Sequence, residues 1–156
     1  MEREEDHSIQ TKKSRRRAVH ETIRNRTKMK KLLLNRWRTP DGTVLTSRHR
    51  HDFVSHKDKK TGLTYIVDGG LDYLRVFNQG SMINLCVYSD ETFEVTREAC
   101  EWGSRGITGK SPIEYTTISK MSEAHIEAVL LTQESMNEEF RKIMMLELEH
   151  RQYLNK

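Results

Sequence analysis

Cysteine and proline are both rare in this chain, with 2 of each among 156 residues. Cys86 and Cys100 are too few for a disulfide framework or for a zinc site with four thiolates. No apolar run is longer than a few residues, far short of the roughly 20 that span a bilayer. No apolar stretch follows the first charged residues, as it would in a secretory signal. We therefore expect a cytosolic protein without a membrane segment.

Apolar residues make up only 35% of the chain and charged residues 32%, with a mean hydropathy of -0.80. Because domains commonly contain about 100 to 150 residues, one domain with an extension is the simplest organisation. A chain this polar builds a small core. We therefore expect a single domain over residues 29–156, and its small core favours self-association, as in a homodimer.

The net charge of +4 is unevenly distributed. Residues 1–31 contain 11 Lys or Arg and 5 Asp or Glu, so the rest of the chain carries 16 and 18, a net charge of -2. Residues 1–28 have few large apolar side chains, and we interpret them as a basic extension, either a flexible tail or a lone helix. This segment has the excess positive charge that drives nonspecific binding to nucleic acid. The side chains that would contact phosphates are Lys12, Lys13, Arg15, Arg16, Arg17, Arg24 and Arg26.

Residues 29–75 have the pattern of short antiparallel strands joined by tight turns. "LLLNRWR" and "TVLTSR" flank "TPDG", in which the proline presets a turn dihedral and the glycine relieves the turn exit. "DFVSH" and "LTYIVD" flank "KDKKTG" in the same way. The pattern predicts a meander of four strands, closed by the pair Gly69 and Gly70.

The second half of the chain is predicted to be helical, which gives the α+β class: a short antiparallel β-meander followed by C-terminal helices. Residues 76–121 would form one short helix with loops, stopped by Gly103, and residues 122–154 would form two further helices. The expected starts are polar residues that cap free backbone amides, namely Ser89 or Asp90, Ser122 and Ser135. The side chains expected to face the core are Phe93, Thr96, Cys100, Ile126, Val129, Leu130, Phe140, Ile143, Met144 and Leu148.

The stretch "SRHRHDFVSH" contains the histidines His49, His51 and His56. Imidazole is a good zinc ligand, and His49 and His51 would lie on one face of a strand. Asp52 would point to the opposite face, which favours structural or interface histidines over a metal site. The pair His51 and Asp52 also suggests a metal-dependent phosphohydrolase, but such enzymes place further ligands at helical spacing. Because no Ser, Cys and His constellation is recognisable, we expect no catalytic residue, metal or cofactor.

Two glycine-containing stretches remain. In "VDGGLDYLR", Gly69 and Gly70 permit positive φ or a close backbone approach, which is typical of a turn. The alternative is a recognition surface made by nearby Asp72, Tyr73 and Arg75, because Tyr and Arg anchor interfaces well. "GSRGITGKS" has the wrong spacing for a phosphate-binding loop, so it indicates a surface loop, with anion binding by Arg105 and Lys110 as the alternative.

The stretches "SRHRHDFV" and "VDGGLDYLR", with the later "EWGSRGITGKS" and "HIEA", resemble small accessory proteins of tailed bacteriophages over roughly residues 31–150. The resemblance implies that simpler relatives have two cysteine pairs, one on the turn before the H-D-F segment and one on the turn after it, which look like a zinc ribbon. Here those turns, "TPDG" and "KDKKTG", contain no cysteine, so hairpin turns would replace structural zinc. The resemblance implies a phage origin and a location in the host cytoplasm, and it brings no assigned activity.

Small phage proteins without a catalytic constellation often bind and redirect a host enzyme or defence complex. The resemblance therefore implies a noncatalytic accessory protein that binds a host protein or complex and inhibits or modulates it. The candidate contact residues lie on the turns, the glycine-containing loop and the last helix: His49, Arg50, His51, Asp72, Tyr73, Arg75, Arg105, Lys110, Glu138 and Glu139. The alternative is a nucleic-acid-binding accessory protein that uses the basic extension, with His49, Arg50 and Tyr73 nearby.

Overall fold

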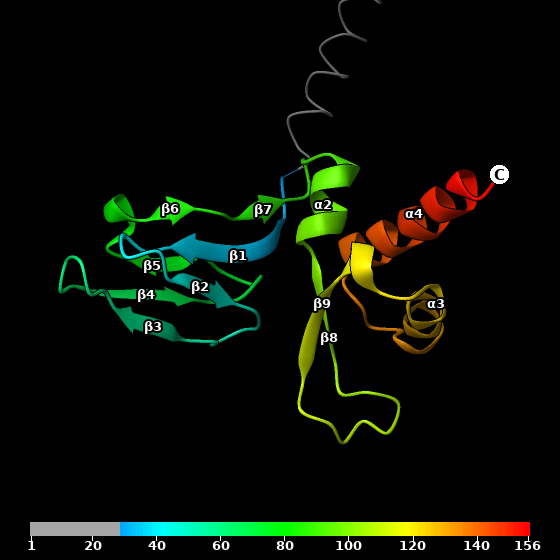
Figure 1. The fold of residues 1–156 in the computed structure, drawn as a ribbon, viewed down its shortest axis with the longest axis horizontal. Coiled ribbons are helices and arrows are strands. Elements are labelled where there is room, and N and C mark those ends of the chain that lie inside the picture. Colours follow the sequence, from blue (N-terminus) through cyan, green and yellow to red (C-terminus); the bar gives the residue numbers. More distant parts are fainter. Residues whose placement is uncertain (1–28) are drawn as a thin grey trace, which may run out of the picture. The chain divides into compact units, whose positions relative to one another are not determined.

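The computed structural model describes residues 29–156, so the expectations for residues 1–28 lie outside the described residues. Residues 31–156 form one unit in which antiparallel strands come first and most of the helical structure last (Figure 1). The predicted α+β class is confirmed. Within residues 29–156, no helix is both long enough and apolar enough to cross a membrane.

Both predicted hairpins are present, because each combines a suitable turn with strands whose burial alternates. Leu45 and Ser47 are the buried residues of one strand, and Tyr65 and Val67 are buried on another. The strands of the described residues are β1 (Leu32–Arg38), β2 (Val44–Ser47), β3 (Val54–Lys57), β4 (Thr64–Asp68), β5 (Arg75–Phe77), β6 (Ile83–Asn84), β7 (Val87–Tyr88), β8 (Glu101–Ser104) and β9 (Glu114–Thr117).

The first seven strands are divided between two small sheets. β1 pairs antiparallel with β2, β6 and β7, while β3, β4 and β5 form a second antiparallel sheet. The predicted meander is therefore divided after its first hairpin, since β2 and β3 belong to different sheets. The sequence does not reveal β5, β6 and β7, because strands of two or three residues are too short to show a period of two.

A small apolar core joins the two sheets. Trp37 and Leu45 from the first sheet and Tyr65 and Val67 from the second are at most 4% exposed, and Met82 packs with them. Burial of large apolar side chains is the main stabilising contribution available to sheets this small. This core also fixes which face of the β3–β4–β5 sheet points inward.

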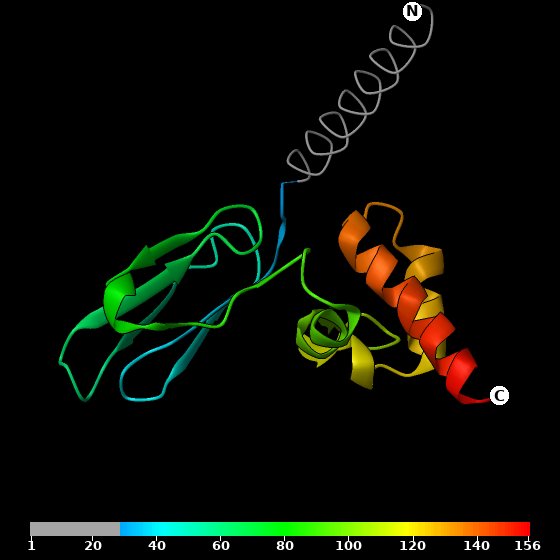
Figure 2. The same cartoon turned by 90° about the horizontal axis from the view of Figure 1, so that it is seen from above.

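The helices form a second core. They are α2 (Phe93–Ala99), α3 (Glu123–Thr132) and α4 (Glu138–Leu154), with 3-10 turns η1 (Gln79–Ser81) and η2 (Ile118–Lys120). Figure 2 shows α4 as the long helix near the C-terminus, beside α3. The ten side chains predicted to face the core are all buried or partly buried, as expected. Leu33 of β1 packs into this second core, so β1 contributes to both.

The predicted start of α2 is wrong. The helix is capped by Thr92, whose hydroxyl accepts a hydrogen bond from the amide of Val95, instead of by Ser89 or Asp90. The hydroxyl of Ser89 has a different partner, because it accepts a hydrogen bond from the amide of Lys31. A tertiary contact to the start of β1 therefore replaces the local capping bond that the sequence suggests.

The predicted end of α2 and the predicted start of α4 are also wrong. α2 ends at Ala99 instead of Gly103, because Cys100 turns to extended dihedrals of -71° and 127° and leads into β8. α4 begins after Asn137, whose side chain accepts a backbone amide, instead of at Ser135. The predicted cap of α3 at Ser122 is confirmed. The glycine-containing stretch is the end of β8 and the loop of the β8–β9 hairpin.

A buried ion-pair network joins α2 to α4. Glu147 is fully buried, and its carboxylate accepts hydrogen bonds from Nε and Nη2 of Arg97 at 2.6 and 2.7 Å. Nε of Arg151 donates to the same carboxylate at 2.8 Å. The bonds from Arg97 outweigh the effect of burial and, with those from Arg151, hold the pKa of Glu147 below its usual value.

Candidate functional site

The two motif stretches lie side by side because they share buried hydrogen bonds. The side-chain amide of Asn35 donates to the carbonyl oxygens of Asp68 and Gly70 at 3.3 and 3.0 Å. The hydroxyl of Ser47 accepts a hydrogen bond from the amide of Gly70 at 2.8 Å and donates to the carbonyl oxygen of Asp52 at 2.7 Å. Since the residues Asn35, Ser47 and Asp68 are each at most 3% exposed, these bonds fix the two stretches against each other.

Gly69 and Gly70 permit this close approach. Their φ values are +101° and +56°, in the region that favours glycine. A Cβ atom on Gly70 would lie 2.4 Å from the carbonyl carbon of His49, and one on Gly69 would lie 2.0 Å from the carbonyl oxygen of Tyr73. The expectation of positive φ or a close backbone approach is confirmed in both respects.

Three of the predicted contact residues come together at Asp68. Nδ1 of His51 lies 3.0 Å from the hydroxyl of Tyr73, which donates to Oδ2 of Asp68 at 3.3 Å. Nη2 of Arg75 lies 3.0 Å from the same carboxylate oxygen. The Asp68 side chain is 5% exposed and that of Arg75 is 70% exposed. Asp68 is thus a buried anchor that orients side chains on the surface.

The remaining contact residues on these turns make local contacts. Nε2 of His49 lies 3.9 Å from a carboxylate oxygen of Asp52, and the His49 side chain is exposed. Arg50 and Asp72 are also exposed. The turns therefore present His49, Arg50 and Asp72 to solvent from the same fixed backbone that carries His51.

The other four candidates lie on different elements. Arg105 and Lys110 are exposed on the loop of the β8–β9 hairpin. Glu138 and Glu139 occupy the first turn of α4, where Glu139 pairs with Lys31 at 3.3 Å. Within residues 29–156, no hydrogen bond or ion pair joins these four side chains to the motif turns. The structure thus divides the predicted contact set between separate places.

Residues 49–77 bury two of their four acidic side chains, whereas all five of their basic side chains are exposed. Asp58 and Asp68 are 1% and 3% exposed, Asp52 is partly exposed, and Asp72 is the exposed acid of this segment. The exposed basic residues of the segment are Arg50, Lys57, Lys59, Lys60 and Arg75. We call the exposed side chains of residues 49–77 the β3–β5 surface. It is strongly basic, although the described domain as a whole has no excess of basic residues.

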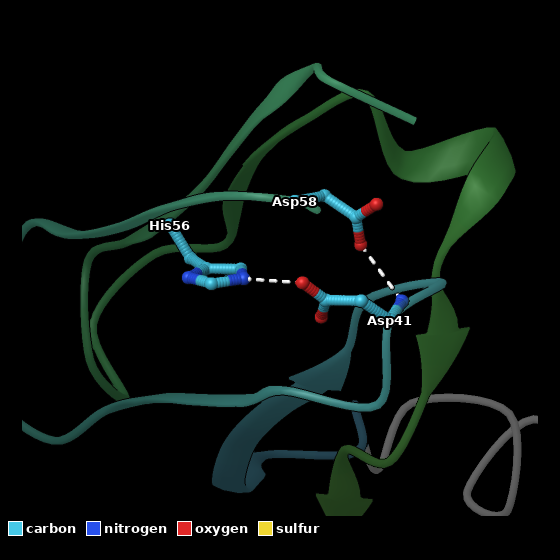
Figure 3. Close-up of side chains that lie close together, drawn as sticks. All are labelled: Asp41, His56 and Asp58. Carbon is cyan, nitrogen blue, oxygen red and sulfur yellow. Dashed lines mark hydrogen bonds and ion pairs between the residues drawn. The ribbon is translucent and has the colours of Figure 1, made fainter. Parts of the chain in front are cut away.

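A second cluster joins the β1–β2 loop to β3 and to the β3–β4 loop (Figure 3). Nε2 of His56 lies 2.7 Å from Oδ2 of Asp41, whose amide donates to Oδ2 of Asp58 at 2.8 Å. Among residues 29–156, these three form the single group of His, Cys, Asp or Glu whose ligand atoms are near enough to share a metal ion, all within 4.8 Å. His49 and His51 are not part of it, so the three histidines of the motif are not brought together.

Protein donors already occupy the carboxylate oxygens of this cluster. The donors are the His56 imidazole, the hydroxyls of Thr39 and Thr61, and the amides of Asp41, Thr43, Lys59, Lys60 and Thr61. The bond from His56 contributes most to a lowered pKa of Asp41. Burial alone would raise the pKa of Asp58, but the donated hydrogen bonds outweigh burial and lower it. The cluster, which we call the loop junction, therefore has the chemistry of a structural cross-link.

Sequence reasoning missed the loop junction, although both turns contain an aspartate. Aspartates in turns commonly accept hydrogen bonds from nearby backbone amides, and this local signal is visible in "TPDG" and "KDKKTG". What the sequence does not reveal is that the two turns meet. Their meeting depends on the packing of the two sheets.

Glu101, at the start of β8, joins the motif turns to the helical half. Its two carboxylate oxygens accept hydrogen bonds from Arg36 at 2.7 Å and from Arg48 at 2.8 Å. The guanidinium of Arg48 also lies 4.2 Å from the centre of the Tyr115 ring. Arg48, Glu101 and Tyr115 line a cavity of about 50 Å³. Since pockets for organic ligands are several times larger, this cavity suits water only.

The two thiols are not activated. Burial raises the pKa of Cys86, and it raises that of Cys100 to about 12. The thiolate is the reactive form of cysteine, so a raised pKa makes both residues poor nucleophiles at neutral pH. Neither cysteine supplies the activated nucleophile that covalent catalysis needs.

A fold class does not determine a function, so the surfaces described above, and not the fold, indicate what the chain can bind. No known protein family matches this sequence, and no curated protein or solved structure shows significant similarity to it.

Proposed function

We propose that this chain is a noncatalytic accessory protein that binds an anionic macromolecule of its host through the β3–β5 surface and modulates the host machine to which it belongs. The observation that carries the proposal is the separation of charge within residues 49–77. Asp58 and Asp68 are buried there, while the basic side chains are exposed. A surface of one sign attracts a partner of the opposite sign and rejects others.

The anchoring of exposed side chains also supports a binding role. Asp68 holds Tyr73 and Arg75, and Tyr73 contacts His51. Side chains that are ordered before binding lose less conformational entropy on binding. Tyr and Arg are also the residue types that contribute most at protein interfaces. The β3–β5 surface is therefore suited to recognition.

The resemblance of the motif stretches to phage accessory proteins implies a partner in the cytoplasm of a bacterial host, and within it a host protein complex. The basic surface would require an acidic face on that complex, and nucleic acid is the alternative. Both have the required charge.

A charge-reversal variant tests the proposal. The full chain and the variant Arg50→Glu/Lys57→Glu are immobilised, exposed to bacterial lysate with and without nuclease, and the retained macromolecules are quantified. The matched control is Lys120→Glu/Lys142→Glu, which reverses two exposed charges outside the β3–β5 surface. We expect one partner to be retained stoichiometrically by the original chain and the control, and lost from the first variant. Equal retention by all three proteins, or by none of them, contradicts the proposal.

A further inference from the structure

Strand register defines the outer face of the β3–β4–β5 sheet. Val67 and its two cross-strand neighbours pack on the core between the sheets. Successive side chains of a strand point to opposite faces, so the adjacent row points away from that core. This row consists of Ser55, Ile66 and Phe77. The outer face of the sheet therefore has an apolar centre.

Two aromatic rings are exposed on this face. Phe77 is 61% exposed and Phe53 is 56% exposed. Phe53 directly precedes β3, at the end of the turn that leads from β2, and its ring is exposed beside the start of that strand. A strand spacing of about 4.8 Å puts Phe77, two strands away, roughly 10 Å across the sheet from the strand that Phe53 precedes. Grouped apolar side chains in solvent mark interaction sites.

The exposed charged side chains of this face are basic. Lys57 and Arg75 are each two residues from the Ser55–Ile66–Phe77 row on their own strands, and both are exposed. The acid of the face, Asp68, is buried beneath Arg75 and ion-paired with it. The face thus has an exposed ring, Phe77, with the cations Lys57 and Arg75 on either side of its row, and a second exposed ring, Phe53, at the start of β3.

We propose that this outer face binds single-stranded nucleic acid, with bases stacked on Phe53 and Phe77 and phosphates at Lys57 and Arg75. The inference rests on the proposed function and names its partner class. A single strand offers unpaired bases and phosphates along one chain, which matches separated exposed rings with cations beside them. A duplex keeps its bases stacked inside, and an acidic protein face would match the charges without matching the rings.

Binding to short oligonucleotides tests the inference. Fluorescence anisotropy is measured with the full chain and labelled oligothymidylate or oligouridylate of about 15 nucleotides, within the size range of single-strand sites. Comparison of the affinities for the two oligomers shows whether the face binds DNA or RNA. We expect at least one to bind, with weak competition by a duplex of equal length. In the variant Phe53→Ala/Phe77→Ala, affinity falls by about tenfold per ring.

Matched variants exclude a general effect of mutation. Leu131→Ala removes an 83% exposed apolar side chain from α3 and leaves affinity unchanged. Phe53→Tyr/Phe77→Tyr keeps both rings and retains binding. A full-length variant in which Lys12, Lys13, Arg15, Arg16 and Arg17 are replaced by Gln still shows the dependence on the rings. Circular dichroism of each variant verifies that the domain is folded.

The outcomes separate the two proposals. Absence of oligonucleotide binding, or equal binding by the Phe53→Ala/Phe77→Ala variant, overturns the inference. If a protein partner from lysate is lost only from the charge-reversal variant while no oligonucleotide binds, the proposed function stands and the single-strand inference fails. If the charge reversal has no effect in lysate, the proposed function fails. Any ring-dependent binding of oligonucleotides would then involve Phe53 and Phe77 but not the basic side chains.

Discussion

Oδ2 of Asp41 and Nε2 of His56 lie 2.7 Å apart, and this contact joins the β1–β2 loop to a strand of the other sheet. The amide of Asp41 extends the connection to Asp58 in the β3–β4 loop. The loop junction is therefore a hydrogen-bonded cross-link between the two sheets.

The variant Asp41→Asn should lower the thermal stability of the domain by several degrees. Both carboxylate oxygens of Asp41 accept hydrogen bonds, and an amide group would turn an NH2 toward one set of donors. Thermal unfolding followed by circular dichroism measures the effect. Asp90→Asn, at an exposed position, is the control and should unfold with the original Tm. Equal Tm values for the two variants would show that the junction contributes nothing to stability.

Acid should destabilise the domain. Asp41, Asp58 and Glu147 have folded-state pKa values below their usual ones, so the unfolded chain takes up protons first as the pH falls. Their stabilisation is fully present above the usual carboxylate pKa of about 4 and is lost as the pH falls below it. Denaturant unfolding from about pH 7 to about pH 3 measures this loss. Asp41→Asn should lose less stability than the original chain over the same range, and an equal loss would exclude Asp41 as a source.

Gly70→Ala should prevent correct packing of the two motif turns. The new methyl group would lie 2.4 Å from the His49 backbone, which cannot move without breaking the hydrogen bonds at Ser47. Gly62→Ala is the matched control, because its φ of +71° is similar and a Cβ there meets no atom within 4 Å. We expect soluble, folded Gly62→Ala and a much less stable Gly70→Ala. Similar unfolding curves would mean that backbone conformation matters and the close approach does not.

The sequence predicted those features of the fold that depend on local patterns. The hairpins around "TPDG" and "KDKKTG", and Ser122 at the start of α3, lie where turn patterns and capping place them. Features that depend on tertiary contacts were not predicted. Ser89 binds the Lys31 amide instead of capping α2, and the strands that pair with the far side of β1 are too short to show periodicity.

The candidate site likewise has features that local sequence patterns predict and features that depend on tertiary contacts. The glycine pair follows from residue type and spacing, whereas the sequence names His51, Tyr73 and Arg75 only as separate candidate contact residues, which the structure brings together at Asp68. The loop junction and the outer-face pair of Phe53 and Phe77 require knowledge of which strands are neighbours. Register and sheet packing, which a single sequence does not encode locally, decide both.

Glu147→Gln should destabilise the domain by about 3 kcal/mol, because it leaves two guanidinium groups beside a neutral partner in a buried place. Glu147 is fully buried and accepts from Arg97 and Arg151, which joins α2 to α4. Glu149→Gln, at an exposed position two residues along the same helix, is the control and should change stability little. Denaturant titration gives the difference in the free energy of unfolding. A loss for Glu147→Gln no larger than that for Glu149→Gln would mean that apolar packing alone holds α2 against α4.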